Sequence, residues 1–428
     1  MKRVLLATTA LCMGAGTAVA DVALSGVAEM GVAASKDNSV RFHTDVNVTF
    51  TLSGETDAGV AFGSAIELAE SGDGSAAVDD DDNHGGIAVH MSDPDGFGTL
   101  TLGDTDGGYD WAMIEVGSGG IRDDSEHGAW NGNGGLDGKH DGQILRWDRD
   151  IAAGFAFGAS VELHDHKDNA PSNDPILGFG GTYSMGMGAG TLALGGGVQM
   201  GSFDHTIEGG LTAAERAAKA DKPVIWGTAT PTPVGTVGAT GSSAGASVTK
   251  GRTVEGREVE GMIVGGSAKM DFGGDGGGIS VTLNGSVMEA DGSHTSGTGD
   301  AARTMTADVE KTHLGVGFGY TVGGISLGLN VGSMVTESRV DPNNAVNTAG
   351  SDHYMIDETV TGVGFDVAYD LGGGATLKFG VGSHETEYDY TYARDSAASG
   401  ASGTGANAAG HDYSSDTNKW SLGVAFAF

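Results

Sequence analysis

The chain has 428 residues, of which 78 are glycine, and its 57 Asp and Glu residues far outnumber its 22 Lys and Arg residues. This acidic balance argues against nucleic acid as a partner, because nucleic-acid binding needs a basic surface. No segment after residue 21 carries the roughly 18 continuous apolar residues that a transmembrane helix requires.

The N-terminus has the three parts of a secretory signal peptide. Two basic residues follow the first methionine, residues 4–11 form a short apolar stretch, and the sequence AVA at 18–20 supplies the small residues of a cleavage site. We therefore expect a signal peptide over residues 1–20 and a mature chain that begins at Asp21.

Removal of this signal peptide also removes Cys12, the only cysteine of the chain. The mature chain can then form neither a disulfide framework nor a cysteine-based catalytic or zinc site. An exported chain without a helical anchor is either soluble or a β-barrel, since only a closed barrel satisfies all its backbone groups in lipid without helices.

Alternation with a period of two residues predicts β-strands along the mature chain. Between Val40 and Leu52 the even positions are mostly apolar and the odd positions are polar, which is the pattern of a transmembrane strand. The sequence predicts one all-β domain over 21–428, a 16-stranded antiparallel transmembrane β-barrel. Its strands are expected near residues 21–35, 39–53, 58–70, 85–92, 98–103, 143–149, 153–164, 175–184, 191–200, 260–271, 278–289, 311–320, 325–336, 359–370, 375–384 and 418–428.

Short and long connections alternate between these segments. Short turns are expected at 53–59, 92–98, 185–190, 321–324 and 370–374, with long polar connections between them. Outer-membrane barrels have this layout, with the turns in the periplasm. An even number of strands then puts both termini on the periplasmic side. Residues 201–259 are expected to form a long extracellular loop that covers either the mouth of the barrel or a subunit boundary.

Glycines occur inside the predicted strands, where glycine normally weakens pairing. Most of them fall on positions expected to face the interior of the barrel, and two explanations are open. Small inward residues leave a wide lumen, or they relieve crowding and allow strong coiling of the strands. The glycines concerned are Gly195, Gly197, Gly315, Gly317, Gly319, Gly380 and Gly382.

One hydrolase-like motif is present, with Ser326 at the centre of the G-x-S-x-G pattern of residues 324–328. That chemistry needs a sharp turn from a strand into a helix. Ser326 lies inside an alternating segment that no helix follows, so we expect the match to be chance and the protein not to be an enzyme.

Three motifs and the C-terminal residue resemble the general-diffusion porins of alphaproteobacteria, of the Rhodobacter type. DVALSGVAEMGV follows the AVA cleavage site, GFGTLTLGDTDGG occupies 96–108, YDLGGGATLKFGVG occupies 369–382, and the chain ends on the aromatic Phe428. The resemblance implies a sixteen-stranded barrel that forms homotrimers in the outer membrane of a Gram-negative bacterium, in contact with its lipid and lipopolysaccharide. It also implies that Phe428 is the signal that the barrel-assembly machinery recognises.

In that family the third extracellular loop folds into the lumen, and its carboxylates face basic side chains of the wall. Mapped onto this chain, the inward loop spans 103–143 and carries Asp104, Asp106, Asp110, Glu115, Asp123, Asp124 and Glu126. The basic groups expected across from it are Arg41, His43, Arg146 and Lys378. Apposed rows of opposite charge in a narrow pore tune its ion selectivity. Because inward Lys and Arg are few, we predict a cation-selective pore.

No cofactor is required for such a channel, but clustered carboxylates can bind Ca²⁺ through hard oxygen ligands. The candidates for a calcium site are Asp104, Asp106 and Asp110 of the inward loop and, alternatively, the acidic run at 79–82. The spacing of an EF-hand is absent from both, and the alternative to a calcium site is solvated charge.

Three functions compete on the sequence. The first is a channel for passive diffusion of ions and small hydrophilic solutes. The second is a substrate-specific channel of the same fold, which would need a track of aromatic or charged residues along the lumen. The third is a soluble, secreted β-protein or adhesin such as a calcium-binding solenoid, which would show a fixed short repeat that the sequence lacks.

Overall fold

The structure is a computed structural model that describes residues 21–36, 38–69, 84–116, 120, 135–140, 143–163, 175–209, 252–274, 277–296, 303–343, 352–394 and 409–428. The predicted signal peptide and the acidic run at 79–82 lie outside the described residues. Among the described residues, no helix is both long and apolar enough to cross a membrane.

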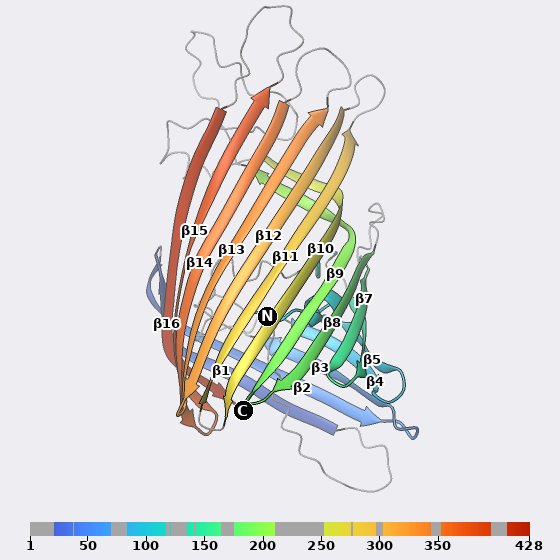
Figure 1. Ribbon diagram of the computed structural model, residues 1–428, viewed down its shortest axis with the longest axis vertical. Coiled ribbons are helices and arrows are strands. Elements are labelled where there is room, and N and C mark those ends of the chain that lie inside the picture. The colour runs from blue at the N-terminus through green and yellow to red at the C-terminus, as the bar shows by residue number, and fades with distance from the viewer. Residues whose placement is uncertain are drawn as a thin grey trace, which may run out of the picture.

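Sixteen antiparallel strands form one closed barrel, in which each strand pairs with its neighbours in the sequence and β1 pairs with β16 (Figure 1). The prediction of a 16-stranded antiparallel barrel is confirmed. The elements are β1 (Asp21–Ser35), β2 (Asn38–Glu55), β3 (Ala61–Ala69), β4 (His84–Asp93), β5 (Gly98–Gly103), α1 (Gly108–Ala112), β6 (Ile144–Ala152), β7 (Phe155–Glu162), β8 (Ile176–Met187), β9 (Gly190–Gly209), β10 (Arg252–Gly274), β11 (Gly277–Ser296), β12 (Arg303–Val322), β13 (Ile325–Asn343), β14 (Asp352–Gly372), β15 (Ala375–Arg394) and β16 (Ala409–Ala427).

The two faces of each strand follow the alternation of the sequence. On β2, Phe42 is 87% exposed on the outer face, whereas its neighbours Arg41 and His43 are partly buried on the inner face. Apolar side chains exposed on the outside of a closed barrel are solvated by lipid rather than by water. The same alternation extends across the cross-strand register, where Phe42 lies beside Val32 of β1.

The wall of the barrel is much taller on one side than on the other. Strands β9–β16 contain 19 to 23 residues each, whereas β3–β8 contain 6 to 12. In Figure 1 the strands from β10 to β16 form the long, slanted part of the wall. Because about 9–11 residues suffice for a tilted strand to cross the bilayer, the longer strands extend well beyond it.

The sequence underestimated these longer strands because their added ends lack an apolar outer face. Asp291 of β11 pairs with Asp308 of β12, which pairs with Arg339 of β13, all on the outward face and all outside the predicted strands. The loop predicted over 201–259 is too long at both ends for the same reason, since β9 continues to Gly209 and β10 begins at Arg252. A strand outside the lipid needs a pairing partner but no apolar surface.

The barrel closes through the two ends of the chain. β1 and β16 are in register from Val27 opposite Ala427 to Ser35 opposite Lys419. Beyond the strand, the backbone N–H of Phe428 donates to the carbonyl of Gly26 at 2.9 Å. Over these positions the closure pairs the two edges that an open sheet would leave exposed.

Ser326 lies near the start of β13, with its hydroxyl 3.2 Å from that of Thr321 across the turn. The strand continues to Asn343, so the residue does not stand at a turn from a strand into a helix. The arrangement lacks the elbow on which G-x-S-x-G hydrolases depend.

Candidate pore constriction

The connection between β5 and β6 enters the barrel and packs on one side of its inner wall. Its helix α1 contacts β6, β7, β8 and β9. Tyr109, Met113 and Leu136 of this loop are fully buried. They form an apolar cluster with wall residues of β8–β12, namely Ile176, Phe203, Val259, Ile263, Ala290 and Val309. Because β8 and β9 lie half-way round the closed order from β1 and β16, the loop sits across the lumen from the closing strands.

Inward glycines of the wall form the surface against which the loop packs, which we call the glycine floor. A Cβ at Gly195 of β9 would overlap the carbonyl oxygen of Ala112, and one at Gly180 of β8 would overlap that of Gly108. A Cβ at Gly158 of β7 would lie 2.8 Å from the ring of Trp111. At these positions glycine is needed for close approach of the loop backbone.

This arrangement gives several of the predicted strand glycines a role that neither explanation included. Gly195 and Gly197 lie beneath α1, and Gly315 and Gly317 of β12 lie beneath the side chain of Val116. Here the small residues make room for the inward loop rather than leaving the lumen empty.

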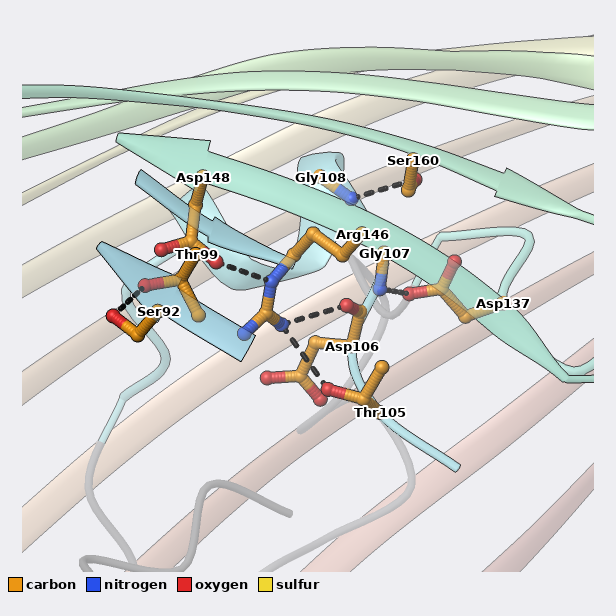
Figure 2. A network of polar contacts seen from close by, with 10 residues as sticks. All are labelled: Ser92, Thr99, Thr105, Asp106, Gly107, Gly108, Asp137, Arg146, Asp148 and Ser160. Carbon is orange, nitrogen blue, oxygen red and sulfur yellow. Dashed lines mark hydrogen bonds and ion pairs between the residues drawn. The ribbon is translucent and has the colours of Figure 1, made fainter. Parts of the chain in front are cut away.

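Arg146 of β6 binds the start of the loop, at Thr105 and Asp106 (Figure 2). Its guanidinium donates to the carbonyl of Asp106 at 2.7 Å, to the hydroxyl of Thr105 at 3.3 Å and to Asp148 at 3.1 Å. The same group lies 5.8 Å from the ring centre of Trp111. Arg146 is therefore on the loop's own side of the lumen and not across from it, because inward parity does not say where round the barrel a residue lies.

Serine hydroxyls on two strands bind the incoming limb of the loop, which is residues 104–116. Ser160 of β7 accepts the backbone N–H of Gly108 at 2.8 Å, and Ser267 of β10 accepts that of Ile114 at 2.8 Å. These bonds satisfy backbone groups of an irregular segment that would otherwise be buried without partners.

Glu162 of β7 binds the outgoing limb, which is residues 135–140. It is 1% exposed, and its two carboxylate oxygens accept the backbone N–H groups of Gly138 at 3.0 Å and His140 at 3.1 Å. Gln199 of β9 also contacts this limb. Four wall residues that bind the loop were not predicted from the sequence, because their only signal is a polar residue at an inward position of a glycine-rich strand. They are Ser160, Glu162, Gln199 and Ser267.

Three of the predicted basic residues lie on the strands across from the loop. Arg41 and His43 belong to β2, and Lys378 belongs to β15. The acidic partner of Lys378 and His43, Glu29 of β1, was not predicted from the sequence. Its carboxylate lies 3.2 Å from the ammonium of Lys378 and 3.8 Å from Nε2 of His43. A carboxylate thus stands within the basic cluster.

Four of the predicted loop carboxylates lie on the incoming limb. Asp104 is exposed, whereas Asp106, Asp110 and Glu115 are partly buried. The other three, at 123, 124 and 126, lie outside the described residues. Over the part of the chain that the structure describes, no group of three or more His, Cys, Asp or Glu side chains could hold a metal ion. Calcium at Asp104, Asp106 and Asp110 stays a prediction.

The pKa of Asp137 predicts that the attachment of the outgoing limb depends on pH. Burial raises the pKa of this carboxyl from its ordinary 3.8 to about 6, against the hydrogen bonds from Gly107 and Gln199 that favour the carboxylate. A carboxyl with a raised pKa favours the docked loop when protonated. This stabilisation is complete below pH 3.8 and is lost as the pH rises through about 6.

We therefore expect the wild-type loop to be held more firmly at pH 5 than at pH 7.5. The measurement is the open-channel current noise of single channels, which should fall on acidification. Asp137→Asn should lose this pH dependence, whereas Glu55→Gln, a change at the exposed end of β2, should keep it. An equal dependence in Asp137→Asn and wild type would rule out Asp137 as the titrating group.

Comparisons with known proteins agree with this architecture. A family model described as Gram-negative porin matches residues 7–428. No curated protein matches the chain in sequence.

Solved structures are similar over nearly the whole chain. The loop-L8 deletion form of OmpT, an outer membrane protein of Vibrio cholerae, is 12% identical, with 96% of this chain and 99% of that chain covered and a TM-score of 0.50. A porin refined at 1.8 Å is 18% identical, with coverage of 95% and 100% and a TM-score of 0.48. A triple mutant of the Rhodopseudomonas blastica porin is 13% identical, with coverage of 95% and 100% and a TM-score of 0.47. At such identities only the fold is comparable, and it is the family model, spanning nearly the whole length, that identifies this chain as a member of the Gram-negative porin family.

Proposed function

We propose that this protein is a cation-selective porin, through which ions and small hydrophilic solutes cross the outer membrane by passive diffusion. The observation that carries the proposal is the inward loop, which is docked along β6–β12 and faces the closing strands β1 and β16 across the lumen. A loop fixed on one side of a closed barrel narrows the passage without needing to move. Membership of the Gram-negative porin family supports the outer-membrane location.

Ion pairing along the inner wall supports the preference for cations. Three inward basic side chains each have a carboxylate partner, with Arg146 at 3.1 Å from Asp148, Lys269 at 3.4 Å from Asp271, and Lys378 at 3.2 Å from Glu29. A paired cation repels mobile cations less than a free one does. The carboxylates of the loop add negative charge to the lumen, which favours cations.

A planar bilayer separating two KCl concentrations tests both parts of the proposal. We expect discrete conductance steps and a reversal potential whose sign corresponds to K⁺ permeating more readily than Cl⁻. Folded, purified protein that gives no conductance would end the porin proposal, whereas conductance with the opposite sign would end only the cation selectivity.

Glu29→Gln should weaken the cation selectivity, because it frees Lys378 and removes the carboxylate next to His43. We expect the ratio of K⁺ to Cl⁻ permeability to fall about twofold, since one charge near a narrow passage changes its field. Glu55→Gln removes the same charge at the exposed end of β2 and should leave the ratio unchanged. Equal ratios in wild type and Glu29→Gln would contradict the role given to Glu29.

The assembly and origin of the protein belong to the same proposal. The motifs at 96–108 and 369–382 support a relationship with the Rhodobacter-type porins, and with it a homotrimer in contact with lipid and lipopolysaccharide. The Vibrio cholerae OmpT structure described as a trimer form is similar to this chain only in fold, at 13% identity. Conductance steps in groups of three would support the trimer, and single steps throughout would contradict it.

A further inference from the structure

The two limbs of the inward loop are joined to each other and to the wall through one buried side chain. Gln199 of β9 is 1% exposed and points from the inner wall into the loop. Its Oε1 accepts the backbone N–H of Leu136 at 2.6 Å, and its Nε2 donates to Oδ1 of Asp137. Both ends of the amide are therefore used by the outgoing limb.

Asp137 extends this contact to the incoming limb. Its second oxygen, Oδ2, accepts the backbone N–H of Gly107 at 2.7 Å, directly before α1. Gln199, Asp137 and Gly107 thus form a chain of hydrogen bonds from the wall, through the outgoing limb, to the start of the helix. We call these three residues the limb clamp.

The backbone of the outgoing limb approaches Gln199 closely at Gly135. Gly135 has a φ of +73°, in the left-handed region that favours glycine, and a Cβ there would lie 2.6 Å from Oε1 of Gln199. Other wall residues each bind one limb only. Arg146 and Ser160 bind the incoming limb, and Glu162 binds the outgoing limb.

We propose that Gln199 is the positioning residue of the constriction, which fixes the width of the passage by holding the two limbs of the loop together. The inference rests on the proposed porin function. Loss of one partner from a buried, satisfied network leaves the remaining donors and acceptors unpaired, which costs more than the bond itself contributes. Without the clamp, the limbs are tied to the wall separately and can move relative to each other.

A reciprocal exchange of the two side chains tests this directly. Gln199→Glu places a second carboxylate against Asp137, and Asp137→Asn leaves one carbonyl oxygen for two donors. In the double variant Gln199→Glu/Asp137→Asn, one oxygen of the introduced glutamate can accept the Leu136 N–H, and its other oxygen can accept the amide of the introduced asparagine. The oxygen of that asparagine can then accept the Gly107 N–H. The double variant therefore re-forms the same three bonds.

We expect each single variant, and the apolar Gln199→Met, to raise the open-channel current noise of single channels at pH 7.5 by about threefold, as a loosened segment should. The double variant should return the noise and the mean conductance to wild-type values. Thr191→Val, on the same inward face of β9 near the turn, is the control for a change on this strand and should behave as wild type.

The outcomes separate the clamp from the porin function. Wild-type protein that folds and does not conduct removes the proposed function. Conducting wild type with unchanged noise in Gln199→Met, or a double variant as noisy as the single variants, overturns the clamp. A residue that only stabilised the barrel would lower the melting temperature of all the variants without this rescue by exchange.

Discussion

Gly195→Val should lower the single-channel conductance by about twofold, because the added side chain occupies the space of the loop and a narrower passage carries less current. A Cβ at this position already overlaps the carbonyl oxygen of Ala112, the last residue of α1. The loop remains tied at Arg146, Ser160 and Glu162, so the end of the helix at Ala112 has to move away from the wall and into the lumen. The measurement is the conductance of single channels in symmetric KCl.

Gly186→Val is the matched control for this change. Gly186 lies on the inward face of β8, and a Cβ there meets nothing within 4 Å. Valine also suits a strand better than glycine does. We therefore expect wild-type conductance from this variant. If Gly195→Val conducted as wild type does, the glycine floor would not determine the position of the loop.

Deletion of Phe428 should reduce the yield of assembled protein in the outer membrane by about tenfold or more, because the closing strands then lose their last pairing and expose an edge. The backbone of Phe428 exchanges hydrogen bonds with Gly26, at 2.9 Å and 3.4 Å. Its side chain is 80% exposed and adds little to packing within the barrel. The readout is the amount of folded protein in outer-membrane fractions.

Phe428→Ala separates the two contributions of this residue. The substitution keeps the backbone bonds to Gly26 and removes only the exposed ring. We expect it to refold in detergent as well as wild type does and yet to accumulate poorly in cells, as a recognition signal requires. Normal cellular yields from both variants would show that the resemblance at the C-terminus has no functional meaning.

The closed barrel could be predicted because lipid imposes one rule on every strand. Where a strand crosses the membrane, as between Val40 and Leu52, its apolar outer face makes the strand recognisable in the sequence. Beyond the membrane that rule no longer applies. The ends of β11–β13 at which Asp291, Asp308 and Arg339 pair were therefore not predicted.

The constriction was predicted in outline and not in its attachments. The loop and its carboxylates follow from the family motif at 96–108, but alternation shows only that a residue faces inward. It does not show which strand faces the loop. Arg146 was therefore expected across the lumen from the loop, although it binds the start of the loop at Asp106. For the same reason Glu29 was not predicted as the partner of Lys378.

The pairing of Phe428 with Gly26 has a consequence for the order of folding. A hairpin with a short turn, such as β12–β13, closes over a few residues, whereas this last pairing closes over about 400 residues, at an entropic cost about 4 kcal/mol greater. Such a high contact order makes closure the slow step. Until this pairing forms, the edges of β1 and β16 that face each other are open to pairing with other chains. The tendency of this protein to aggregate should therefore depend on the time that passes before β1 pairs with β16.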